Sequence, residues 1–183
     1  MLTELPEYPW DAMAPYVAQA KAHPGGAIDL SIGSPVDPTP AVIRDALAQA
    51  TDSHAYPTTI GTPALREAIV EWFARRRGVT GLGVENVLPT IGSKEFVAWL
   101  PFMLRLGPGD VVVHPTAAYP TYDIGARMAE ATPFPSDDPA QWPENTKLVW
   151  LNSPGNPDGR VLDKVQLKAR VDRARELGAY IVG

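Results

Sequence analysis

Apolar segments alternate with helical patterns along the second half of this chain. The segments VVVHP at 111–115, TKLVWLN at 146–152 and AYIVG at 179–183 are rich in valine, isoleucine and leucine, and helical patterns lie between them. Strands that are apolar throughout are buried on both faces, and strand–helix alternation is typical of a parallel sheet covered by helices. We therefore predict an α/β fold of three layers, α/β/α, with a mainly parallel sheet.

Further elements are predicted from periodicity, caps and breakers. Helices are expected at 11–21, 41–51, 63–77, 93–106, 119–130 and 163–178, with Thr62 and Asp163 as N-caps of two of them. In the helix at 93–106 we expect Phe96, Leu100, Met103 and Leu104 to face inward. Additional strands are expected at 27–33, 85–92 and 132–134.

Composition excludes several classes of protein. The net charge of −5 argues against a nucleic-acid partner, and no apolar run reaches the roughly 18 residues of a membrane-spanning helix. The chain has no cysteine, which excludes disulfides, thiolate metal sites and a cysteine nucleophile. The first residues, MLTELPEYPWDAM, lack the features of a secretory signal. We expect a cytoplasmic protein with neither a membrane nor a nucleic acid as partner.

Three segments open a loop or helix after a predicted strand, at 90–94, 114–122 and 151–159, and ligands bind at such strand ends in parallel sheets. In TIGSKE, Gly92 permits close approach and Ser93-Lys94 begins a helix, whose free amides can bind an anion. A plain helix cap is the structural alternative. Tyr119 follows VVVHP and either stacks on a planar ligand or packs as a turn residue.

The loop NSPGNPDG at 152–159 places Asn156 before a proline, which restricts its backbone. A held amide side chain can donate to an oxyanion or a phenolate oxygen without carrying charge, and so lowers the pKa of that oxygen. Tyr56 stands in a loop before the helix at 63–77. It is a candidate binding residue, and the structural alternative is a Tyr-Pro turn whose hydroxyl is in water.

Five segments together resemble the class I and II aminotransferases, which are pyridoxal-phosphate enzymes of fold type I. NSPGNPDG is similar to their N-x-P-x-N-P-x-G motif, and YPTTIGTPALRE at 56–67 to their Tyr-x-x-x-x-Gly-x-x-x-Leu-Arg segment. LSIGSPVDPTP, TIGSKE and PTAAYPTY resemble the family's substrate loop, phosphate cup and ring-stacking segment, in the family's order. LPEYPWDAM with DLSIGSPVDPTP most resembles the actinobacterial N-succinyldiaminopimelate aminotransferases, which take the amino group from glutamate in the lysine and diaminopimelate pathway.

The resemblance implies a role for each matching residue. Gly92, Ser93 and Lys94 would bind the cofactor phosphate, Tyr119 would stack on the pyridine ring, and Asn156 would donate to the ring's phenolic oxygen and also touch the substrate carboxylate. Tyr56 would reach the phosphate of a neighbouring subunit in a homodimer, and Gly33 would lie beside the substrate carboxylate. The substrates would be amino acids and 2-oxo acids.

The resemblance also divides the chain into an N-terminal arm with the substrate loop, at 1–40, and the first part of the cofactor-binding large domain, at 41–183. The family's Schiff-base lysine, pyridine-nitrogen aspartate and carboxylate-binding arginine come later than the segments matched here. We therefore expect the 183 residues to be the N-terminal half of an aminotransferase, with no catalytic lysine among them. The alternatives are a non-catalytic remnant that binds a ligand or dimerises, and another enzyme of the same fold, such as a C–S lyase or an aminotransferase of different substrates.

Overall fold

The computed structural model describes residues 5–30, 33 and 35–183. The chain forms two compact units: one contains the described residues up to Ala18 together with Thr90–Gly183, and the other is Gln19–Pro89. The division at residue 40 that the resemblance implies remains a prediction.

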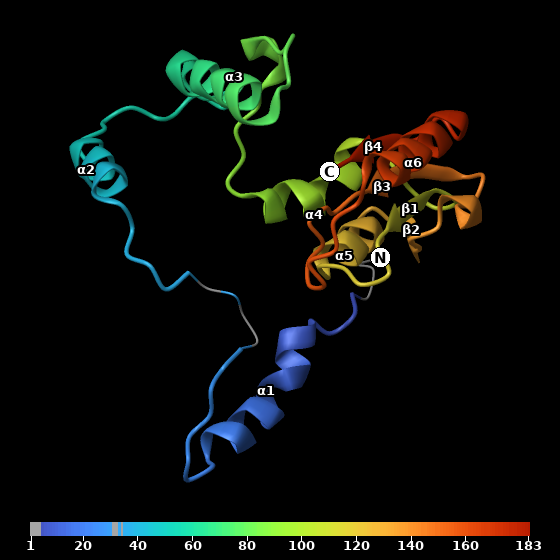
Figure 1. Ribbon diagram of the computed structural model, residues 1–183, viewed down its shortest axis with the longest axis horizontal. Coiled ribbons are helices and arrows are strands. Elements are labelled where there is room, and N and C mark those ends of the chain that lie inside the picture. Colours follow the sequence, from blue (N-terminus) through green and yellow to red (C-terminus); the bar gives the residue numbers. More distant parts are fainter. Residues whose placement is uncertain (1–4, 31–32, 34) are drawn as a thin grey trace. The chain divides into compact units, whose positions relative to one another are not determined.

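The larger unit is built on four parallel strands, β1 (Val111–His114), β2 (Thr132–Pro135), β3 (Thr146–Trp150) and β4 (Tyr180–Val182). Their order in the sheet is β2-β1-β3-β4 (Figure 1). In the register, Val113 pairs with Phe134 on one side and with Val149 on the other. The predicted parallel sheet is confirmed.

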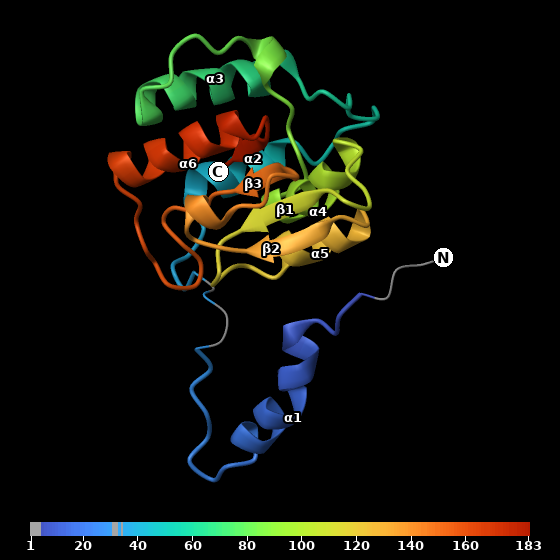
Figure 2. The same ribbon diagram turned by 90° about the vertical axis from the view of Figure 1, so that its right-hand side faces the viewer.

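Helices cover both faces of this sheet (Figure 2). On one face, Val112 and Leu148 pack against α4 (Ser93–Met103) and α5 (Thr121–Met128). On the other face, Val113 and Val149 pack against Ala174 of α6 (Lys164–Glu176) and against Trp142, which follows a short 3₁₀ turn, Pro139–Gln141. Alternate residues of each strand point to opposite faces, so the all-apolar strands supply both layers of the core, as the sequence predicts.

A glycine brings α4 and α5 into close contact. A Cβ atom built on Gly125 of α5 would lie 2.9 Å from the carbonyl oxygen of Val97 and 3.2 Å from Cα of Ala98, both in α4. The first separation is shorter than real Cβ contacts show, and the second is tighter than most of them. The absence of a Cβ at Gly125 therefore sets how closely α4 approaches α5.

The predicted caps of two helices are confirmed. Asp163 begins α6 with a capping box: its carboxylate accepts from the N–H of Gln166 at 2.8 Å, and the Gln166 side chain accepts from the N–H of Asp163 at 3.0 Å. Thr62 begins α3 (Pro63–Arg77) by accepting from the N–H of Leu65 at 3.2 Å.

The smaller unit contains α2 (Ala41–Gln49), α3 and a 3₁₀ turn, Val84–Asn86. The helix α1 (Pro9–Lys21) crosses the boundary between the units. None of the described residues from 19 to 89 is buried. Of these helices α3 has a side-chain N-cap at Thr62, whereas α2 has none.

Two predicted strands are wrong in the part of the chain that the structure describes. Residues 27–30 and 33 form no strand, and 31 and 32 lie outside the described residues. The segment 85–92 begins within a 3₁₀ turn and continues without regular structure. Pro89 lacks the N–H that a strand ladder needs. Leu88 and Ile91 are exposed, so no apolar burial favours a strand there.

The inward face predicted for α4 is only partly correct. Phe96, Leu100 and Leu104 pack against the core, as expected, whereas Met103 is exposed. The side chains of α4 that are buried are Val97 and Pro101, and Val97 lies where α5 approaches closely at Gly125.

Candidate functional site

A pocket of about 320 Å³ lies where α4 begins and where the loops after β1 and β3 converge. This volume is within the range of about 300–1,000 Å³ that is typical of small-molecule sites. All three segments come from the larger unit. The pocket is lined by Ser93, Lys94, Val97, Tyr119, Tyr122, Asn152 and Asn156.

The start of α4 contributes hydrogen-bond donors. Gly92 has φ 79° and ψ 152°, a conformation that is open essentially only to glycine, while a Cβ there would meet no atom within 4 Å. The backbone conformation, and not crowding, therefore requires this glycine. The first amides of α4 have no partners within the helix, and the Ser93 hydroxyl lies beside them in the pocket lining. This set of donors suits an anion.

Lys94 adds a positive charge to the same lining. Its Nζ lies 3.4 Å from the hydroxyl of Tyr8, and 4.9 Å and 5.9 Å from the ring centres of Tyr8 and Tyr119. The hydrogen bond with Tyr8 contributes most to raising the pKa of Lys94, and contact with Tyr119 raises it further. The side chain is therefore a cation at neutral pH.

The loop after β1 contributes aromatic rings. Burial raises the pKa of Tyr119, but the side chains of Thr121, Tyr8 and Lys94 outweigh this effect and hold the pKa below its ordinary value. Burial raises the pKa of Tyr122, whose ring centre lies 5.3 Å from that of Trp150. The packing on Trp150 fixes Tyr122 against the core, while Tyr119 stays at the pocket surface.

The loop after β3 contributes two amide side chains. The N–H of Asn156 donates to Oδ1 of Asn152 at 2.7 Å. Two backbone hydrogen bonds close the loop, from Gly155 to the carbonyl of Arg160 at 2.8 Å and from Gly159 to that of Gly155 at 2.9 Å. Both asparagines therefore come from an ordered turn, as expected for a binding loop.

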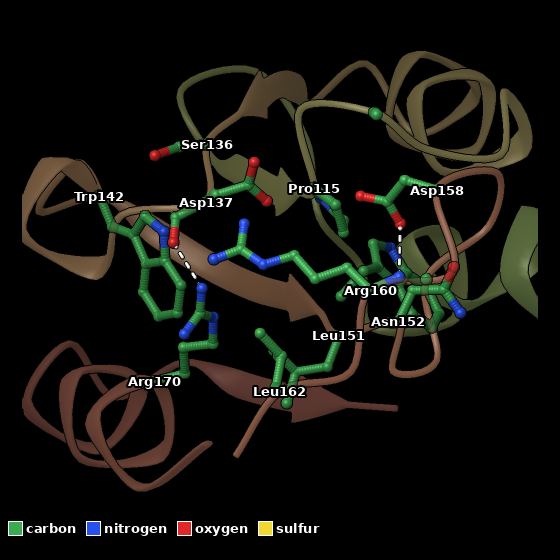
Figure 3. Close-up of a pocket in the computed structure, with 13 residues that line it drawn as sticks. Pro115, Ser136, Asp137, Trp142, Leu151, Asn152, Asp158, Arg160, Leu162 and Arg170 are labelled. Carbon is green, nitrogen blue, oxygen red and sulfur yellow. Dashed lines mark hydrogen bonds between the residues drawn. The ribbon is translucent and has the colours of Figure 1, made fainter. Parts of the chain in front are cut away.

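A second, smaller pocket of about 40 Å³ adjoins this loop, on the side of the sheet covered by α6. Figure 3 shows the Arg160 side chain extending along it towards Trp142, and the Arg170 guanidinium donating to the carbonyl of Asp137 at 2.6 Å. Asn152 lines both pockets. This space is suited to a single small group or water molecule rather than to a cofactor.

The structure brings together most of the site residues that the sequence predicts. Ser93, Lys94, Tyr119 and Asn156 line one pocket, and Gly92 precedes it directly. Tyr56 and Gly33 belong to the smaller unit, where both are exposed. Their expected roles remain predictions.

Three neighbours of the pocket were missed by the sequence reasoning. Tyr8 contacts Lys94, and no local pattern connects two residues so far apart. Tyr122 stands in the same PTAAYPTY segment as Tyr119, and Asn152 is the first asparagine of NSPGNPDG. For these two, the signal lies in segments that already resemble the family's ring-stacking segment and its N-x-P-x-N-P-x-G motif.

The donors, rings and size of this pocket fit pyridoxal phosphate. The amides at the start of α4 with Ser93 and Lys94 match a phosphate, Tyr119 offers a ring face, and Asn156 offers a neutral donor. The fold is thus an α/β domain whose candidate pocket lies at the carboxyl ends of parallel strands, where ligands bind in such sheets.

Comparison with known proteins identifies the family. The model of the family described as aminotransferase class I and II matches residues 26–182, and the chain belongs to this family, whose cofactor is pyridoxal phosphate. It is 53% identical over 182 residues to the 4-dedimethylamino-4-oxo-anhydrotetracycline transaminase OxyQ of Streptomyces rimosus, covering 99% of this chain and 50% of the relative. It is 35% identical over 196 residues to an LL-diaminopimelate aminotransferase of Desulforudis audaxviator, covering 98% and 50%.

A solved aminotransferase from Neisseria meningitidis has the same fold, with a TM-score of 0.86 and 30% identity over 98% of this chain and 50% of that one. The chain thus spans about half the length of the relatives it matches. Among the described residues, no helix combines the length and apolarity needed to cross a membrane, and no three acidic, histidine or cysteine side chains gather as metal ligands would.

Proposed function

We propose that this chain binds pyridoxal phosphate in the pocket at the start of α4 and takes part in amino-group transfer between an amino acid and a 2-oxo acid. One observation carries the proposal: Lys94, Tyr119 and Asn156, from three separate segments, line the same pocket. Family membership supports the reaction class.

The phosphate binds at the beginning of α4. The backbone amides and the hydroxyl of Ser93 donate to its oxygens, and the Lys94 cation balances its charge. Gly92 allows the backbone to adopt the turn from which these amides point outward. A helix N-terminus with an adjacent cation is a favourable environment for a dianion.

Residues of the loops after β1 and β3 would hold the ring. Tyr119 stacks on its face, and the Asn156 amide donates to the phenolic oxygen and so favours the anionic form of that oxygen. When bound, pyridoxal phosphate acts as an electron sink for the carbon that carries the amino group. This chain's residues bind and orient the cofactor for that chemistry.

The covalent attachment point is not assigned to a lysine of this pocket. Among residues 90–183, Lys94 is the only lysine that lines it, and its raised pKa keeps it charged, which suits phosphate binding better than nucleophilic attack. We assign the catalytic lysine, the pyridine-nitrogen aspartate and the carboxylate-binding arginine to parts of the whole protein outside these 183 residues. We also propose that Gly33 lies beside the substrate carboxylate. Tyr56 would reach the cofactor phosphate of the other subunit in a cytoplasmic homodimer.

For the substrate pair we propose N-succinyldiaminopimelate and 2-oxoglutarate. In the biosynthetic direction glutamate is the amino donor to the corresponding oxo acid, and N-succinyldiaminopimelate is the product. The resemblance of the N-terminal segments supports it, and so does the similarity to an LL-diaminopimelate aminotransferase. A 4-oxo-anhydrotetracycline-type ketone is the second candidate acceptor, supported by the 53% identity to the Streptomyces rimosus transaminase.

The test is performed on the whole purified protein in two steps. Equilibrium dialysis measures pyridoxal-phosphate binding, and glutamate formation from 2-oxoglutarate is then measured with N-succinyldiaminopimelate or LL-diaminopimelate as donor. Glutamate formation with the succinylated donor supports the proposal, and formation with the free donor alone redirects the substrate. Binding without any transfer supports the non-catalytic alternative, pyruvate release from a cysteine conjugate supports a C–S lyase, and absence of binding contradicts the proposed site.

A further inference from the structure

Asn152 connects the sheet to the residue that faces the cofactor. The preceding residue, Leu151, donates its N–H to the carbonyl of Val182 at 2.7 Å, which ties the end of β3 to β4. One residue later, Oδ1 of Asn152 accepts from the N–H of Asn156 at 2.7 Å. A continuous path of two short hydrogen bonds therefore runs from the sheet to Asn156.

The direction of the Asn152 amide is determined by chemistry. A backbone N–H can only donate, so the atom of Asn152 that faces Asn156 must be the oxygen. The amino group of Asn152 is consequently directed elsewhere in the lining that the two pockets share. In Figure 3 this amide lies at the end of the smaller pocket near Asp158, away from the guanidinium of Arg160.

Asn156 is held through its backbone and not through its side chain. Its side chain is exposed and makes no hydrogen bond to the other described residues, so no neighbour holds the amide that faces the cofactor pocket. The backbone N–H, in contrast, is held by Asn152. A residue whose backbone is held keeps its Cα–Cβ direction, which leaves only side-chain rotation to be ordered when a ligand binds.

We propose that Asn152 is a positioning residue for pyridoxal phosphate: it holds the backbone of Asn156 so that the Asn156 amide meets the phenolic oxygen of the cofactor. This inference rests on the proposed function, because it assigns the cofactor pocket to that ligand. Asn152 acts through Asn156, so the effects of the two side chains on binding are coupled.

The experiment compares Asn152→Ala, Asn156→Ala and the double variant in the whole protein, using equilibrium dialysis with pyridoxal phosphate. Asn152→Ala is expected to weaken binding about five- to tenfold, the equivalent of one ordinary hydrogen bond. In the Asn156→Ala background the same change is expected to have an effect of less than about twofold, because the side chain through which it acts is gone. Equal effects in the two backgrounds would overturn the proposal.

Ser153→Ala is the matched control. It removes another hydrogen bond of the same loop, from the N–H of Leu162 to Ser153 Oγ at 2.9 Å, without touching Asn156. Both Ser153→Ala and Asn152→Ala are expected to lower stability, but only Asn152→Ala to weaken cofactor binding. Equal losses of affinity in the two variants would reduce Asn152 to a structural role.

Hydrogen exchange of the Asn156 amide in the cofactor-free protein gives an independent readout. Asn152→Asp keeps an acceptor oxygen and is expected to retain protection, while Asn152→Ala is expected to lose it. Unchanged protection in Asn152→Ala would contradict the inference even if the cofactor binds. Wild-type protein that does not bind pyridoxal phosphate at all would instead overturn the proposed function, and with it this assignment.

Discussion

The side-chain nitrogen of Lys94 lies 3.4 Å from the hydroxyl of Tyr8, a residue 86 positions earlier in the chain. Tyr119 also lies beside this cation, with its ring centre 5.9 Å away. Lys94 is therefore held by two tyrosines at the edge of the cofactor pocket and remains charged. The arrangement makes the phosphate end of the pocket electropositive before any ligand binds.

Replacing Lys94 should change the ionisation of Tyr119. The Lys94 cation favours the phenolate, so Lys94→Met is expected to raise the pKa of Tyr119, whose burial then acts with less opposition. An ultraviolet difference titration against the Tyr119→Phe variant measures this pKa. Lys94→Arg retains the charge and is expected to leave the pKa low; a fall in the Lys94→Met variant would contradict the assigned contact.

The contribution of Lys94 and its tyrosine contacts to stability should depend on pH. The pKa of Lys94 is raised in the folded protein, so its interactions with Tyr8 and Tyr119 are fully present below the unfolded value of 10.5 and are lost as the pH rises through the folded value. We expect the stability difference between wild type and Lys94→Met to shrink in strongly alkaline solution. Urea denaturation at neutral and alkaline pH measures it, and a constant difference would argue against the charge.

Tyr119 should matter for cofactor affinity through its ring. Tyr119→Ala is expected to weaken pyridoxal-phosphate binding by about two- to tenfold, because an aromatic stacking contact is lost. Tyr119→Phe keeps the ring and should bind nearly as wild type does. Equilibrium dialysis compares the two, and equal affinity of the alanine variant and wild type would mean that Tyr119 only packs.

Asn156 should tune the ionisation of the bound cofactor. In Asn156→Ala a donor to the phenolic oxygen is lost, so the pH at which the absorbance of the bound cofactor changes is expected to rise by roughly one to two units. Asn156→Asp, which replaces the donor with a negative acceptor, should raise it further. An unchanged spectral titration in both variants would remove Asn156 from this role.

Gly125→Ala should destabilise the protein, although helix propensity alone predicts that it would be stabilising. Alanine stabilises a helix by about 1 kcal/mol over glycine, but a Cβ here would lie 2.9 Å from the Val97 carbonyl, and overpacking costs about 1–3 kcal/mol. We expect Gly125→Ala to lower the free energy of unfolding in a urea titration. Gly107→Ala, where a Cβ has open space, is the control; a Gly125→Ala variant as stable as wild type would refute the close-packing argument.

Much of the candidate site could be predicted because its signals are local. Gly92-Ser93-Lys94 at a helix start, Tyr119 after an apolar strand and Asn156 in NSPGNPDG each stand within a few residues of the element that carries them. Tyr8 could not be found in this way, since its contact with Lys94 depends on how the arm folds back. The strand expected at 85–92 is wrong for a different reason: its apolar residues suggest a strand, but Leu88 and Ile91 are exposed and no burial favours one.

The sequence by itself determined the alternation of strands and helices, the caps at Thr62 and Asp163, and the family, because these depend on side-chain chemistry and on neighbours close in the chain. Only the tertiary structure decided which residues share the pocket, which face of α4 is buried, and that Asn152 holds Asn156. Those relationships arise where separate segments pack against each other. Their geometry depends on close contacts such as Gly125 against α4, which no single segment contains.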